Sequence, residues 1–94
     1  MRQIVWRPQS VADRERIFDH IAEDNPAAAL ALDDVFEAKV NTAAANPRLY
    51  KPGRVKGTRE IVAHPNYIIV YREVGPQTLE VLRVLHAAQQ WPTR

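Results

Sequence analysis

The stretch TREIVAHPNYIIVYREVGPQTLEVLRVL, residues 58–85, holds three short runs that are rich in β-branched and aromatic residues. Such runs are typical of β-strands, and they cover residues 58–63, 67–73 and 78–85. The two connections are short and rich in turn-forming residues, His64-Pro65-Asn66 and Val74-Gly75-Pro76-Gln77. The stretch therefore predicts a three-stranded antiparallel meander. Apolar residues on both faces of the last run indicate a central strand.

The residues before this stretch have a different period. Residues 2–7 predict a short strand, and apolar residues at helical spacing then predict a helix over 11–23. Ser10 is the expected N-cap of that helix, with Asp13 completing a capping-box-like pair. Asn25-Pro26 starts a second helix that Asn46-Pro47 ends. The predicted fold class is α+β, with order β-α-α-β-β-β and an antiparallel sheet packed against a helical hairpin.

The composition limits the kind of protein this can be. Ninety-four residues, 46% hydrophobic and 26% charged, predict one globular domain over 1–94. The chain has no cysteine, and its three histidines have no metal-ligand spacing, so we expect neither a metal nor a cofactor. No signal peptide or membrane span is predicted, which leads us to expect a cytoplasmic protein without a membrane partner.

Charge is unevenly distributed along the chain. Residues 13–37 hold eight of the eleven acids, whereas residues 38–94 hold nine bases and three acids. The segment KPGRVKGTRE, residues 51–60, is cationic until its last residue. This segment could bind phosphate or an acidic protein, or it could be a solvated connecting loop. The candidate partner-binding residues of this half are Arg48, Lys51, Arg54, Lys56, Arg59, Arg72 and Trp91.

Two further residues could take part in catalysis. His86 ends the last predicted strand and could act as a general acid or base, or it could simply pack beside Trp91. Tyr67 begins the central strand and could stack on a base, although aromatic residues on strands are more often part of the core. His64 reads as a turn residue and His20 as a surface residue. Cations, a histidine and a tyrosine suit phosphodiester chemistry better than any other.

The element order, the segment PGRVKGTREIVAHPNYIIVYRE (52–73) and the ending LEVLRVLHAAQQWP (79–92) resemble the RelE/ParE superfamily, the toxins of type II toxin-antitoxin modules. The resemblance covers essentially the whole chain. It implies a growth-inhibiting toxin of the kind that stabilises plasmids. Such a toxin is neutralised by an antitoxin, which we expect to be acidic or to lay an extended or helical arm across the basic surface and the sheet edge.

The superfamily divides by target. RelE-like members cut mRNA on the ribosome, whereas ParE-like members inhibit DNA gyrase and cut nothing. Ile68 stands where the RelE-like motif has an arginine that is important for cleavage, so the resemblance favours the ParE-like branch. YafQ, a nuclease, is similar at His86 and Tyr67 but has an aspartate where this chain has Asn66.

The resemblance therefore implies a gyrase inhibitor that is not itself an enzyme, with a ribosome-dependent mRNA endoribonuclease as the alternative. In a nuclease, His86 would be the general acid or base and Tyr67 would stack on a base. Arg59 and Arg83 would stabilise the charge that develops on the phosphate. A third hypothesis is an inactive binding module that acts only as a co-repressor with its antitoxin.

Overall fold

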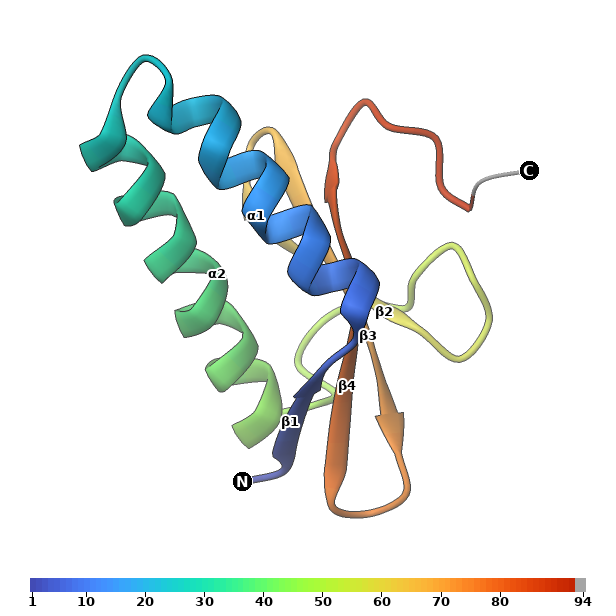
Figure 1. Cartoon of the computed structure of the whole chain (residues 1–94). Helices are drawn as coiled ribbons and strands as arrows, with labels where there is room; N and C mark the ends of the chain where they lie inside the picture. The colour runs from blue at the N-terminus through green and yellow to red at the C-terminus, as the bar shows by residue number, and fades with distance from the viewer. Residues whose placement is uncertain (93–94) are drawn as a thin grey trace.

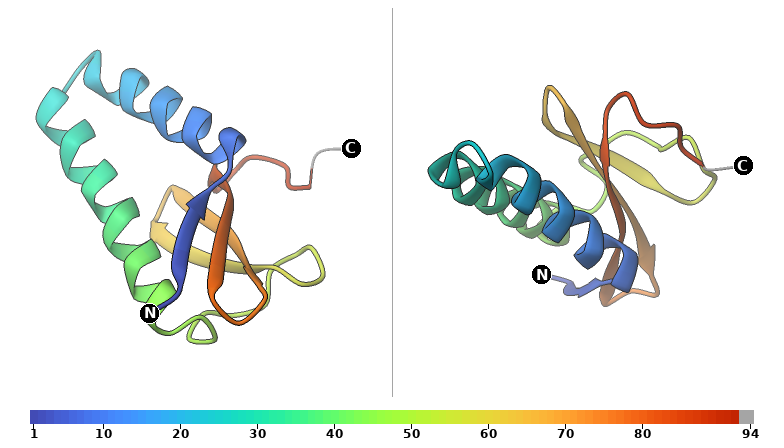
Figure 2. Two further views of the ribbon diagram at one scale, coloured as in Figure 1. Left: turned by 60° about the horizontal axis from the view of Figure 1, so that its bottom comes forward. Right: turned by 45° about the horizontal axis from the view of Figure 1, so that its top comes forward.

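The computed structural model describes residues 1–92. The elements follow the predicted order: β1 (Gln3–Trp6), α1 (Pro8–Ala22), α2 (Pro26–Ala45), β2 (Arg59–His64), β3 (Tyr67–Val74) and β4 (Thr78–His86). The sheet has four strands, and the two helices form a hairpin. Figures 1 and 2 show this hairpin on one side of the sheet. The α+β architecture predicted from the sequence is thereby confirmed.

The sheet has the strand order β1-β4-β3-β2. The meander β2-β3-β4 is antiparallel and β4 is a central strand, both as predicted. β1 pairs with β4 in parallel, with Ile4 opposite Leu79, so the sheet is mixed and the prediction of a wholly antiparallel sheet was wrong in this detail. A parallel pair needs a long crossover, and here the helical hairpin and the basic segment are part of that crossover.

The first helix begins earlier than predicted. Pro8 occupies its first turn and Arg7 is the N-cap residue, so Ser10 lies inside the helix. Ser10 and Asp13 are both buried, and the Ser10 hydroxyl donates to the Arg7 carbonyl at 2.7 Å. The predicted capping box is therefore wrong, because Pro8 already has the fixed φ that suits a first helical position. The start of α2 is as predicted, since the Asn25 side chain accepts from the Ala28 amide at 3.0 Å.

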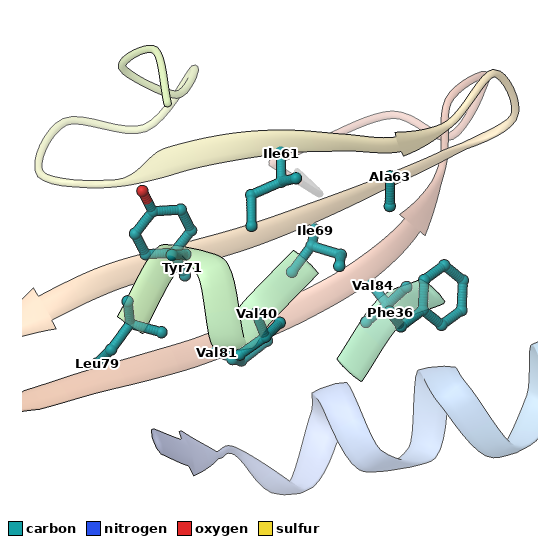
Figure 3. Close-up of a cluster of buried hydrophobic side chains, with 10 residues drawn as sticks. Phe36, Val40, Ile61, Ala63, Ile69, Tyr71, Leu79, Val81 and Val84 are labelled. Carbon is teal, nitrogen blue, oxygen red and sulfur yellow. The ribbon is translucent and has the colours of Figure 1, made fainter. Parts of the chain in front are cut away.

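The core lies between α2 and the inner face of the sheet. Phe36 and Val40 of α2 pack against residues of all three meander strands, among them Ile61, Ile69 and Val81 (Figure 3). Tyr71 belongs to this cluster, and its hydroxyl donates to the Pro47 carbonyl at 2.7 Å. Burial raises the pKa of Tyr71 to about 12, with the Arg59 charge partly opposing the rise.

No helix within residues 1–92 is both long and apolar enough to cross a membrane.

Candidate functional site: a histidine-lined groove and a basic loop

Tyr67 and His86 meet at one end of the sheet. They are register partners on β3 and β4, and their ring centroids lie 5.4 Å apart in an edge-to-face arrangement. His86 is exposed, and its Nδ1 accepts from the Ala88 amide at 3.1 Å. That bond leaves the Nε2 atom free to exchange a proton with a ligand. The structure therefore brings together two of the four residues expected in a nuclease.

Two histidines that the sequence did not single out lie beside this pair. The His64 ring centroid is 5.9 Å from that of Tyr67, and His20 of α1 lines the same groove of about 640 Å³. The opposite wall is apolar and comes mainly from the helices: Ile21, Ala28, Ala31, Leu32 and Val35. The three imidazoles come from α1, β2 and β4, so no spacing in the sequence could have revealed the cluster. Among residues 1–92, no set of three or more His, Asp or Glu side chains is placed to hold a metal ion.

Arg83, the third nuclease candidate, is held by an ion pair. Its Nε and Nη2 atoms donate to the two carboxylate oxygens of Asp13, at 2.7 and 3.0 Å. The same carboxylate accepts from the Val84 amide at 2.9 Å, beyond the point where β1 stops pairing with β4. These bonds to Asp13 raise the pKa of Arg83. Asp13 thus closes the open edge of β4 and neutralises the guanidinium beside it.

Arg16 of α1 donates to the same carboxylate at 3.0 Å, but its side chain is 63% exposed. It lines a hollow next to the groove, together with Tyr67 and His86. Arg16 is therefore a cation at this end of the molecule that the sequence analysis did not identify. Because Arg16 lies among the acidic residues of the first helix, the distribution of charge in the sequence did not indicate it as a candidate.

Arg59, the fourth candidate, lies at the other end of the sheet. It pairs in register with Tyr71, four residues from Tyr67, which corresponds to about 13 Å along a strand. Its guanidinium donates to the Tyr50 carbonyl at 2.6 Å. Arg59 therefore fastens the segment before β2 to the sheet, and it is not grouped with His86.

Apart from Arg59, the predicted binding cations fall into two groups. Three arginines contact carboxylates of the sheet: Arg54 with Glu60, Arg72 with Glu80 and Arg48 with Glu73, at 3.3, 2.7 and 3.6 Å. Lys51 and Lys56 are exposed, and neither has an ion-pair partner among residues 1–92. Trp91 is half-buried, with the Arg83 guanidinium 5.8 Å from its ring centroid.

Solved structures of toxins have the same fold. The chromosomal ParDE toxin-antitoxin system of P. aeruginosa contains a chain with a TM-score of 0.78 and 23% identity, which covers 92% of this chain and 96% of that one. The YoeB/ParE toxin from Agrobacterium tumefaciens gives a TM-score of 0.68 at 20% identity, with 92% and 98% covered. The DinJ-YafQ complex of E. coli gives 0.60 at 18% identity, with 94% and 96% covered. At these identities the likeness concerns the fold.

Sequence comparison identifies the family. Y4kP, a toxin candidate of Sinorhizobium fredii, is 37% identical over 92 residues, which is 97% of this chain and 94% of the relative. The family model described as the ParE toxin of the type II toxin-antitoxin system, parDE, matches residues 4–91. The chain therefore belongs to the ParE family of toxins from type II toxin-antitoxin systems.

Proposed function

We propose that this toxin inhibits growth in the cytoplasm by acting on DNA gyrase and that it does not cleave RNA. The observation that carries the proposal is the pairing of Arg83 and Arg16 with one carboxylate, Asp13. An RNA-cleaving site needs positioned cations where negative charge develops on the phosphate. Here the buried carboxylate binds both guanidinium groups beside the histidine groove and offsets one of their two positive charges, so Arg83 is already paired before any substrate binds.

The sequence supports the same conclusion. Ile68 occupies the position at which the RelE-like branch has an arginine, and its register partners Val62 and Leu85 are apolar too. Arg59, the other candidate cation, is bound to the Tyr50 carbonyl at the far end of the sheet. Membership of the ParE family agrees with a target other than mRNA.

A second candidate function, ribosome-dependent mRNA cleavage, is favoured by the groove itself. His20, His64 and His86 line the groove together with Tyr67, so groups for proton transfer and for base stacking are both present there. In this mechanism His86 acts as the general acid or base and Tyr67 stacks on a base. Arg16, which is largely exposed, would have to leave Asp13 to supply the cation.

The antitoxin is the expected partner in either case. β2 is an edge strand, and the start of the basic segment already covers its first half. The Glu60 amide donates to the Lys51 carbonyl at 3.2 Å, and the Gly53 amide donates to the Thr58 carbonyl, just before β2, at 2.8 Å. Within residues 1–92, no segment pairs with the outer edge of the second half, Ile61–His64, which includes Val62, 60% exposed. We place an extended arm of the antitoxin along this edge, where backbone hydrogen bonds and an apolar side chain can hold it.

Expression of the toxin without its antitoxin tests the proposal. We expect growth to stop and plasmid DNA from the arrested cells to be relaxed, because gyrase no longer supercoils it. Growth arrest with supercoiled plasmid and cleaved mRNA would assign the nuclease function instead. Unimpaired growth would contradict both and would fit a binding module that acts only as a co-repressor.

A further inference from the structure

The basic loop, residues 51–58, is an ordered structure although it joins a helical layer to a sheet. The Gly53 amide donates to the Thr58 carbonyl at 2.8 Å, and both the amide and the hydroxyl of Thr58 donate to the Val55 carbonyl. Buried Glu60 accepts from the Arg54 amide at 2.8 Å and from its guanidinium at 3.3 Å. The loop therefore has a fixed shape before any partner binds.

The close packing of this loop depends on a small residue at position 53. A Cβ atom on Gly53 would lie 2.4 Å from the Thr58 hydroxyl oxygen and 3.1 Å from a Glu60 carboxylate oxygen. Gly57, at the other end of the turn, has a φ of +85° and open space where a Cβ would be. One glycine thus lets the backbone pack inward, and the other forms an exposed turn.

The backbone of the loop lies on the side of the sheet away from α2 (Figures 1 and 2). Lys51 and Lys56 extend from it without a carboxylate partner among residues 1–92, and the charge of Arg54 is shared with Glu60. The only bulky apolar residue within the loop besides Pro52 is Val55, which is half-buried. A protein partner is usually held by a buried aromatic or aliphatic anchor, and the loop offers none.

We infer that the basic loop binds the phosphate backbone of duplex DNA. Lysine ammonium groups and exposed backbone amides recognise phosphate without reading sequence. The loop has no aromatic residue on which a base could stack, and the neighbouring Tyr50 packs edge-to-face on Tyr71, so a duplex fits better than a single strand. The choice of DNA rests on the proposed function, because gyrase acts while bound to DNA.

The test is the binding of the purified toxin to a fluorescent 20-base-pair DNA duplex of arbitrary sequence, measured by anisotropy between about 50 and 200 mM salt. Each phosphate contact contributes about −0.9 to the slope of log K against log salt. The Lys51→Gln/Lys56→Gln variant should therefore reduce the magnitude of the slope by about 2. The matched control is Arg7→Gln/Lys39→Gln, which removes the same charge outside the loop and should leave the slope unchanged.

A second variant tests the shape of the loop. Gly53→Ala keeps every charge but forces the backbone at position 53 and the Thr58 side chain apart, which changes the shape of the loop, so we expect weaker DNA binding at equal net charge. Equal slopes for the loop variant and its control, or no binding by the wild type, would overturn the inference. Tighter binding of the wild type to an RNA duplex of the same sequence would also overturn it. The same holds if the Lys51→Gln/Lys56→Gln variant loses antitoxin binding while its salt slope for DNA is unchanged.

The same variants separate this inference from the gyrase proposal. If the wild type binds DNA through the loop but leaves gyrase active, the inference holds and the gyrase target is wrong. If the Lys51→Gln/Lys56→Gln variant inhibits gyrase as strongly as the wild type, gyrase remains the target, and the loop is shown to have no role in its inhibition.

Discussion

Asp13 and Arg83, 70 positions apart in the sequence, form a two-point ion pair that joins α1 to β4, with donor–acceptor distances of 2.7 and 3.0 Å. The Asp13 residue is 4% exposed, and the Arg83 side chain is 15% exposed. The carboxylate also receives the Val84 amide and the Arg16 guanidinium. One acidic side chain therefore satisfies three donor residues on the edge of β4 that no longer pairs with β1.

Removal of this carboxylate should destabilise the fold strongly. Asp13→Ala leaves the Arg83 charge and the Val84 amide without a partner, and we expect a loss of about 3–5 kcal/mol in the free energy of unfolding. Urea denaturation measures this loss. The control is Asp34→Ala, at an exposed position of α2, which we expect to change stability by less than about 0.5 kcal/mol. The Asp13→Leu/Arg83→Leu variant should be more stable than Asp13→Ala. A cost below about 1 kcal/mol for Asp13→Ala would contradict this role.

The basic loop should lose its order when Glu60 is removed. Glu60→Ala deletes the acceptor of the Arg54 amide and guanidinium, which we expect to cost about 1–3 kcal/mol. Limited digestion with trypsin should then cut faster after Arg54 and Lys56. Glu15→Ala, on the exposed face of α1, is the control and should be cut at the wild-type rate. Equal digestion of both variants would show that Glu60 does not hold the loop.

Alkaline pH should destabilise the protein through Tyr71. Its pKa is raised from 10.0 to about 12 in the folded state, so the unfolded chain loses the proton first as pH rises. The contribution of Tyr71 to the free energy of unfolding is therefore fully present below pH 10. It is lost between pH 10 and 12, at about 1.4 kcal/mol per pH unit. Tyr71→Phe should be less stable at neutral pH, because it lacks the bond to Pro47, but should have a shallower loss above pH 10. Parallel pH profiles would refute the prediction.

His86 and Trp91 separate the two candidate targets in cells. If gyrase is the target, His86→Ala should remain largely toxic, and changes in β4 or in the tail, residues 88–94, should reduce toxicity. Trp91→Ala tests the tail, of which residues 93–94 lie outside the described part of the chain. Colony counts after induction without antitoxin measure both variants, and co-purification with the antitoxin shows that each is folded. Loss of toxicity in His86→Ala alone would favour RNA cleavage.

Local patterns sufficed to predict most of the fold. The period of two in residues 58–85 and the Asn25-Pro26 start signal depend on neighbouring residues, and the structure agrees with both. The parallel pairing of β1 and the role of Asp13 depend on contacts between distant segments. Ser10 and Asp13 have the spacing of a capping box, yet Pro8 starts the helix and their side chains turn inward.

The candidate site was harder to predict for the same reason. His86 and Tyr67 lie at strand ends, which the alternation pattern locates, and they meet as register partners. His20 and His64 join them only through tertiary packing. Likewise, the sequence places Arg54, Arg59 and Arg72 among the cations that could bind a partner, whereas the fold gives each an oxygen acceptor at 3.3, 2.6 and 2.7 Å. Composition reports charge but not its neutralisation by distant carboxylates.

The proposed target is tested most directly with purified gyrase, relaxed plasmid and ATP, to which wild-type toxin or His86→Ala is added. We expect both proteins to block supercoiling, or to trap cleaved DNA, at similar concentrations, and neither to cut mRNA on translating ribosomes. Addition of the cognate antitoxin should restore supercoiling. Full gyrase activity in the presence of the toxin, together with mRNA cleavage that His86→Ala abolishes, would contradict the proposal.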